Sequence, residues 1–276
     1  NTLITVRLAS ELSAGSVSAL NFGWRLMQMP ETIIGTAIAT AVFPTLSEMA
    51  AQERMGALRD TLAATLRAIL ALGLPATLGL VLLGRPAIAV LFRGGEFGGA
   101  SVDAVMAALS GYALGLVGHA ALEMVARAFY AQQDTRTPLW MAALAMLANL
   151  ILSLVLRGPL GHAGLALANS LSVSLEVGGL LWLTRRPLGH VEGRTLWDTF
   201  VRATLAAGVM ALALLGLRAG WPLATDGVVS QVLLLGTGLI LGGGVYLTVA
   251  WCVGLGPVRR LGRRLQRRVF ASRVPY

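Results

Sequence analysis

Long apolar stretches, separated by short polar breaks, make up most of this chain. After an opening stub of apolar and polar residues, seven such stretches cover residues 17–43, 68–92, 104–130, 138–156, 162–184, 199–217 and 228–254. Most of them reach the roughly 20 residues that a helix needs to cross a bilayer. The pattern predicts an all-α polytopic membrane protein, with the end of one transmembrane helix followed by seven further transmembrane helices. The opening "NTLITVRLASEL" resembles the last turns of a membrane helix, so we expect the chain to be the C-terminal part of a longer protein.

The polar breaks predict how these helices are joined. "PTLSEMAAQERMGALRDT" is charged and predicts a helix along the membrane surface. In "QQDTRTP", Asp134, Thr135 and Thr137 are candidate helix caps, and Pro138 suits the first turn of a helix. "RGPLGHAG" predicts a tight turn, and Pro44 and Pro75 are candidate helix kinks.

Composition and charge support the membrane assignment. The chain is 56% hydrophobic and 13% charged, whereas soluble domains are nearer 25% charged. All 22 basic residues are arginine, and the net charge of +9 predicts contact with anionic lipid at helix ends, and no nucleic-acid binding. If the C-terminus is cytoplasmic, sixteen arginines fall on the inner side and four on the outer side. The only cysteine, Cys252, excludes a disulfide within the chain.

Arg25 is the most unusual charge, because it lies inside an apolar stretch. It is about eight residues, or roughly 12 Å, from the outer end of its predicted helix. A guanidinium at the centre of a membrane helix costs roughly 2.5–3.5 kcal/mol on insertion scales. It either faces a hydrated cavity and binds an anion such as phosphate, or it is an interfacial anchor or a structural ion pair.

Other polar residues inside the apolar stretches are candidates for coupling. Glu123 and Arg127 are four residues apart and can pair on one helix face, and His119 lies one turn earlier. These three either form a structural pair with a hydrogen-bonded neighbour, or they take part in coupling or in a proton path.

The polar residues of the next two stretches include a further acid. Glu176 shares its stretch with Asn169 and several serines, and Asn149 and Ser153 are four apart on the preceding stretch. Their oxygens either join helices or bind a small cation. Motifs for zinc proteases, serine hydrolases and nucleotide hydrolases are absent from the sequence, which argues against an enzyme.

Three segments together resemble the MurJ/MviN family of lipid II flippases, within the multidrug/oligosaccharidyl-lipid/polysaccharide exporter superfamily. They are "GSVSALNFGWRLMQMPETIIGTAIATAVFPTLSE", "RPAIAVLFRGGEF" and "RAFYAQQDTRTP". The resemblance implies that residues 1–184 form the C-terminal transport lobe, from the end of helix 7 to helix 12 of the family pattern. Residues 185–256 would form two extra transmembrane helices, and residues 257–276 a basic cytoplasmic tail.

The resemblance also implies a function and a site. The family flips lipid II across the bacterial cytoplasmic membrane by alternating access between two lobes, of which the N-terminal one would be missing here. Arg25 matches a cavity arginine that handles the lipid-linked pyrophosphate, and Trp24 replaces an Asp that often precedes it. Asn149, Ser153 and Asn169 fall at or near a sodium site of some members, although Ser153 stands where an Asp would be. Sodium, protons and membrane potential all stay open as coupling sources.

Two other functions compete with this interpretation. Another exporter of the superfamily would move a different lipid-linked oligosaccharide or a drug, and a drug antiporter would use cavity acids in place of an arginine. A non-transporting membrane scaffold would use the same helices only to bind partners.

Overall fold

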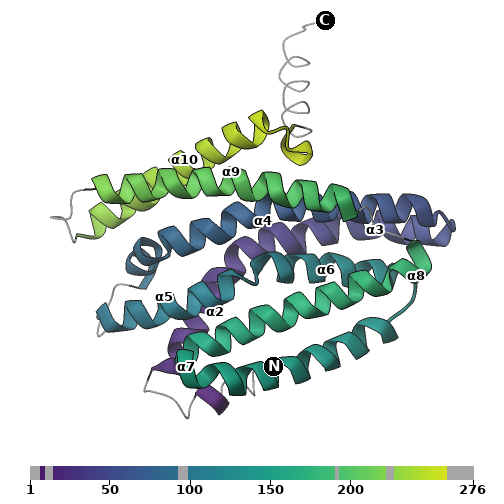
Figure 1. Cartoon of the computed structure of the whole chain (residues 1–276), viewed down its shortest axis with the longest axis horizontal. Helices are drawn as coiled ribbons and strands as arrows, with labels where there is room; N and C mark the ends of the chain where they lie inside the picture. Colours follow the sequence, from purple (N-terminus) through teal and green to yellow (C-terminus); the bar gives the residue numbers. More distant parts are fainter. Residues whose placement is uncertain (1–6, 10–14, 93–98, 190–192, 222–226, 260–276) are drawn as a thin grey trace, which may run out of the picture.

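The chain forms a bundle of long helices that lie roughly along one direction (Figure 1). This computed structural model describes residues 7–9, 15–92, 99–189, 193–221 and 227–259. Within these residues the regular structure is entirely helical, as the apolar pattern predicts. Five helices are individually long and apolar enough to cross a membrane, and a sixth candidate is a bent pair. The predicted stub falls mostly outside the described residues, although residues 7–9 are helical.

The first predicted crossing is one helix with a defect in its middle. α2 (Ser16–Glu31) continues through the π-helical turn η1 (Thr32–Thr36) into α3 (Ala37–Ala51). Pro30 lies just before the π-helical turn, and a proline cannot donate the helical hydrogen bond of its position. Gly35 brings this turn against α6, because a Cβ there would lie 2.8 Å from the Cα of Ala120.

The predicted surface helix at residues 44–61 is wrong. α3 runs on to Ala51, and α4 (Met55–Phe92) begins after a tight turn, so the charged residues occupy the ends of two long helices. The turn includes Glu53 at φ 55, and the Arg54 N–H donates to the Met49 carbonyl at 2.9 Å. α4 continues through Pro75 without a break in its helical assignment.

The third predicted crossing is broken where the sequence gives no proline. α5 (Gly99–Ala113) and α6 (Leu116–Ala131) meet at an angle of 42°. Two hydroxyl groups from other helices donate to carbonyls at the break. Ser170 Oγ donates to the Gly111 carbonyl at 2.7 Å, and Thr77 Oγ1 donates to the Ala113 carbonyl at 3.2 Å. Such bonds make a broken helix tolerable inside a membrane protein.

α7 (Arg136–Leu183) contains the fourth and fifth predicted crossings as two antiparallel arms. Gly161 interrupts it with non-helical angles (φ 55, ψ −135) inside the predicted tight turn "RGPLGHAG". Contacts across the arms fix the register: Asn149 donates to Ser172 at 3.3 Å, and a Cβ on Gly179 would meet the Met141 methyl group at 2.2 Å. Residues 23 apart on one straight helix would be about 35 Å apart, so the chain reverses here.

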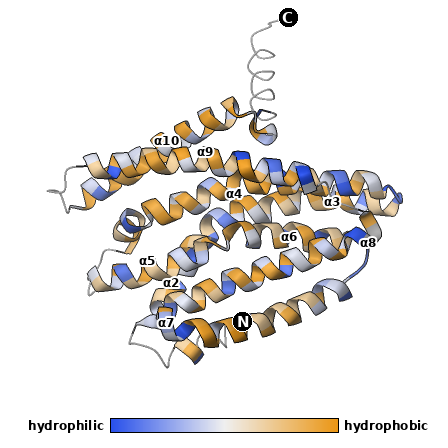
Figure 2. Cartoon of the chain, viewed as in Figure 1, coloured by the Kyte–Doolittle hydropathy of each residue, from blue (hydrophilic) through white to orange (hydrophobic). Residues whose placement is uncertain are grey.

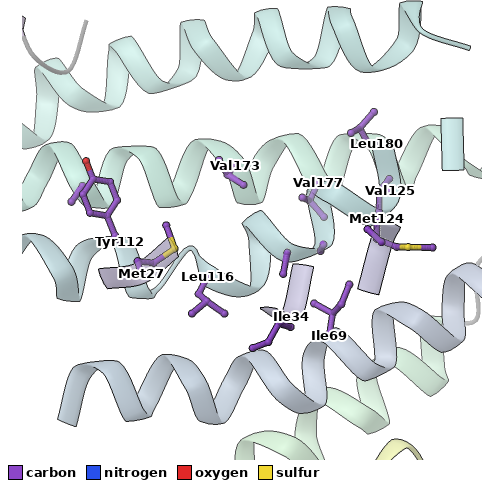
Figure 3. Close-up of a cluster of buried hydrophobic side chains, with 14 of the residues drawn as sticks. Met27, Ile34, Ile69, Tyr112, Leu116, Met124, Val125, Val173, Val177 and Leu180 are labelled. Carbon is purple, nitrogen blue, oxygen red and sulfur yellow. The ribbon is translucent and has the colours of Figure 1, made fainter. Parts of the chain in front are cut away.

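The described side chains form two hydrophobic clusters. The larger one joins α2–α7 and the short α8 (Arg185–Leu188). Figure 3 shows part of this cluster, with labelled side chains that include Met27, Ile69 and Leu180. The smaller one joins α4 to α9 (Gly193–Gly220) and α10 (Val228–Cys252). Many large apolar side chains stay exposed along the helices, and hydrophilic residues are concentrated nearer the helix ends (Figure 2). This distribution suits a protein whose surrounding solvent is lipid.

Candidate functional site

A polar stripe follows one exposed face of the α2–η1–α3 helix. Its members recur every three or four residues and are mostly exposed, with Thr36 half-buried: Ser18, Asn21, Arg25, Gln28, Thr32, Thr36 and Thr40. Recurrence at this spacing keeps side chains on one face of a helix. The opposite face is buried against α5, where a Cβ on Gly23 would lie 2.9 Å from the Leu109 backbone nitrogen.

Arg25 is the only basic residue of this stripe, and its guanidinium is exposed. It is nine residues into α2, about 14 Å along the helix axis. No described residue forms an ion pair or a hydrogen bond with it. The neighbouring Trp24 lies edge-on to the rings of Tyr112 and His119, with both centroid distances 5.2 Å. Within the described chain, therefore, the Arg25 guanidinium remains available to an anion.

A cluster of charged residues lies where the α2–η1–α3 helix packs against α6. Arg127 forms an ion pair with Glu123 and also donates to Thr40 of the polar stripe at 3.4 Å. Glu31, at the end of α2, lies close enough to Glu123 for their charges to interact. The sequence around Glu31 does not predict this contact, because the approach of Glu31 to Glu123 depends on how α2 and α6 pack.

His119 and Asn169 form a hydrogen bond between α6 and the second arm of α7. The His119 Nε2 to Asn169 Oδ1 distance is 3.0 Å, and both side chains are half-buried. The Asn169 side-chain oxygen is therefore engaged by α6. Glu176, on the same arm, is half-buried and has no hydrogen-bond partner among the described residues.

Asn149 and Ser153 lie between the two arms of α7 and are fully buried. The Asn149 amide donates to Ser172 Oγ at 3.3 Å. The Asn149 Oδ1 and Ser153 Oγ atoms have no hydrogen-bond partner in the described structure. Buried polar atoms normally have a hydrogen-bond partner, so these two oxygens are candidate acceptors for a group that the described chain does not supply. In the described chain, no three His, Cys, Asp or Glu side chains gather at one metal-binding position.

Comparison with known proteins identifies the family. The family model described as lipid II flippase MurJ matches residues 1–238. The chain belongs to the MurJ family. It is 34% identical over 263 residues to a probable lipid II flippase MurJ of Vibrio cholerae, with 92% of this chain and 49% of that protein covered. A lipid II flippase MurJ of Burkholderia cenocepacia is 30% identical over 258 residues, with 91% and 49% covered.

Solved structures agree with the fold. A lipid II flippase MurJ in an inward closed conformation superimposes with a TM-score of 0.75 at 22% identity, over 90% of this chain and 49% of that one. An outward-facing multidrug transporter of the MATE family gives a TM-score of 0.54 at 16% identity, over 98% and 66%. The chain is therefore a multi-pass membrane protein of a transporter family, not an enzyme. It spans about half the length of the curated MurJ relatives above.

Proposed function

We propose that this chain is the C-terminal half of a flippase that moves lipid II from the inner to the outer leaflet of the bacterial cytoplasmic membrane. The observation that carries this proposal is the exposed Arg25 guanidinium, which has no partner within the described chain. A guanidinium presents a rigid fork of N–H donors that matches the oxygens of a phosphate. The polar stripe on either side of Arg25 gives a hydrated head group a path along the membrane interior, while the polyprenyl tail stays in lipid.

The mechanism we propose is alternating access. The N-terminal lobe would form the other wall of a central cavity, so that the stripe on α2–η1–α3 faces it. The pyrophosphate would bind Arg25 when the cavity opens to the cytoplasm and leave when it opens outward. Since this chain supplies one wall only, it would need the other lobe to transport.

Rescue of growth tests this proposal. The complete gene would be expressed in bacteria depleted of their own lipid II flippase, as wild type, Arg25→Ala, Arg25→Lys and the control Arg218→Ala. Arg218 is exposed near the end of α9 and donates to the Leu82 carbonyl, away from the stripe. We expect wild type and the control to restore growth and Arg25→Ala to fail at equal membrane abundance. Growth with Arg25→Ala equal to wild type would contradict the proposal.

The coupling ion is a separate proposal. Asn149 and Ser153 would supply two oxygen ligands of a sodium ion, because their oxygens are buried and unpartnered. Asn169 would not join them, since its oxygen is bonded to His119. Replacing external sodium by choline should then slow flipping in the wild type, and Asn149→Ala should remove that sodium dependence. Sodium-independent flipping in the wild type would leave protons, through the Glu31–Glu123 region, or the membrane potential as the source.

We also propose that the C-terminus is cytoplasmic. The support is the arginine asymmetry, since basic residues concentrate in cytoplasmic loops. The same arginines would contact anionic lipids of the inner leaflet. A fluorescent protein fused at the C-terminus should fluoresce, because it folds in the cytoplasm, and a C-terminal alkaline phosphatase fusion should be inactive. The reverse pattern would overturn this orientation.

A further inference from the structure

Two arginine side chains converge on the end of α10. Arg202 comes from α9, and its Nη1 donates to the Val253 carbonyl at 3.1 Å. Arg259 follows α10, and its Nε donates to the Trp251 carbonyl at 3.2 Å. A Cβ placed on Gly254 would lie 3.3 Å from the Nη1 atoms of both arginines. The two Nη1 atoms are therefore separated by no more than about twice that distance.

The backbone explains why both guanidiniums can sit there. Gly254 has φ +81, a conformation that favours glycine, and the Leu255 N–H donates to the Ala250 carbonyl at 2.9 Å. This bond closes the helix, and Leu255 is buried in the cluster that joins α4, α9 and α10. The last carbonyls of a helix carry partial negative charge, which stabilises cations. The arginines are thus held by backbone carbonyls at a fixed place.

The local charge is not balanced by the described residues. Asp198 forms an ion pair with Arg202 at 2.9 Å, but no described acid pairs with Arg259. Arg194 lies one turn before Asp198 on α9 and is exposed. These four side chains together carry a charge of about +2 at neutral pH. Each guanidinium uses only part of its five N–H donors on the protein, so several donors remain for an anion.

Exposed aromatic side chains flank these arginines. Trp197 is 67% exposed, lies five residues before Arg202 on α9, and stacks on Phe200 with a centroid distance of 5.5 Å. Trp251, on α10, is 42% exposed. Exposed indoles at helix ends are typical of the membrane–water interface. Beyond Arg202, α9 presents the exposed apolar residues Leu205, Val209 and Leu212, which suit acyl chains.

We propose that Arg202 and Arg259 form a binding site for the phosphodiester of an anionic phospholipid. The lipid phosphate accepts hydrogen bonds from both guanidiniums, and its acyl chains lie along α9 in the bilayer. The site tethers α9 and α10 to anionic lipid at the end where α10 terminates. It is separate from the Arg25 stripe and does not depend on lipid II transport.

Native mass spectrometry of the delipidated protein, expressed from its complete gene, tests this site. Dioleoylphosphatidylglycerol, dioleoylphosphatidylethanolamine and inorganic phosphate would be added to wild type, to the double variant Arg202→Gln/Arg259→Gln and to the control Arg218→Gln. We expect the double variant to bind phosphatidylglycerol at least fivefold more weakly than the wild type and the control. Binding of phosphatidylethanolamine should be weak in all three, because its ammonium group cancels the phosphate charge.

The remaining measurements distinguish a lipid phosphate from free phosphate, and a loss of binding from a folding defect. If 10 mM inorganic phosphate displaces phosphatidylglycerol completely, the site binds free phosphate and the lipid assignment is overturned. The single variant Arg259→Gln removes an exposed side chain that donates to the Trp251 carbonyl. That carbonyl still accepts a hydrogen bond from the Gly254 N–H, so we expect this variant to keep its fold. It should show part of the loss with an unchanged melting temperature. Equal phosphatidylglycerol binding by all variants would overturn the proposal.

Discussion

Gly115→Ala tests the packing that supports the break between α5 and α6. Gly115 lies against the second arm of α7, where a Cβ would be 2.5 Å from Ser170 Oγ and 2.8 Å from Ser170 Cα. Ordinary contacts between carbon atoms are about 3.5–4.0 Å, so the two helices would have to separate by roughly 1 Å. The Cα is backbone, and a rotamer change of Ser170 cannot relieve that contact.

The expected cost has two parts. Overpacking a tight helix contact costs about 1–3 kcal/mol. Displacing the Ser170 hydroxyl also weakens its bonds to the Gly111 and Tyr112 carbonyls, at 2.7 and 3.3 Å. Hydrogen bonds between membrane helices are worth about 0.6 kcal/mol on average and up to about 1.7. We therefore expect Gly115→Ala to lower the free energy of unfolding by about 2–4 kcal/mol.

Two further variants separate these parts. Ser170→Ala removes the hydroxyl without adding volume, so it should cost only about 1 kcal/mol. Gly178→Ala, on the same arm of α7, is the matched control because a Cβ there meets nothing within 4 Å. It should leave stability unchanged or raise it by up to about 1 kcal/mol through helix propensity. Unfolding in dodecyl sulfate, with the protein expressed from its complete gene, gives all three values. Equal stability of Gly115→Ala and Gly178→Ala would refute the packing argument.

Three other predictions concern polar contacts at separate places. Asp134→Ala should lower the free energy of unfolding by about 0.5–2 kcal/mol, because this carboxylate accepts from two backbone N–H groups at the start of α7. The hydrogen bonds from Thr137 hold the pKa of Asp134 below its usual value, so its contribution is present above about pH 4 and is lost as the pH falls through the lower folded value. Glu123→Gln should lower the free energy of unfolding by about 1–3 kcal/mol, because it leaves Arg127 without its carboxylate partner. Breaking a fully buried ion pair would cost more, and this pair is partly exposed. Tyr246→Phe should cost about 1 kcal/mol, since its buried hydroxyl donates from α10 to a carbonyl of α4.

Each of these predictions has its own measurement. The free energy of unfolding of wild type and of Asp134→Ala would be measured from pH 3 to pH 7. The difference between them should be smaller at pH 3 than at pH 7, and a difference that does not change with pH would contradict the proposed role of the Asp134 carboxylate. A double-mutant cycle on Glu123 and Arg127 should give a coupling energy, and strict additivity would mean that the pair contributes nothing. Tyr246→Phe should increase hydrogen exchange in α10, and an unchanged exchange rate would show that this bond does not hold α10 to α4.

The crossings were predictable because their signals are local. Runs of apolar residues require helices in lipid, and Gly161 and Asp134 mark the turns on either side of the first α7 arm by their own chemistry. The break at Gly115 was not predictable, because it depends on hydroxyls from α4 and α7 that lie far away in the sequence. The surface-helix prediction for residues 44–61 failed because one left-handed residue, Glu53, is enough to turn the chain between two long helices.

The candidate site was only partly predictable for the same reason. The Glu123–Arg127 pair follows from helical spacing alone, and the structure contains it. The approach of Glu31 to Glu123 and the hydrogen bond between Asn169 and His119 depend on how α2, α6 and α7 pack. Spacing along one helix predicts which residues share a face, but it does not predict which neighbouring helix that face meets.

The most direct test of the central claim follows lipid II itself. The complete gene would replace the flippase of the host, and lipid II exposed at the outer leaflet would be measured by its susceptibility to an externally added lipid II-cleaving enzyme. The account predicts exposed lipid II with wild type and with Arg218→Ala, and a loss of at least tenfold with Arg25→Ala at equal membrane abundance. Normal exposure with Arg25→Ala would show that this guanidinium does not handle the substrate, and no exposure with a correctly inserted wild type would show that lipid II is not the substrate.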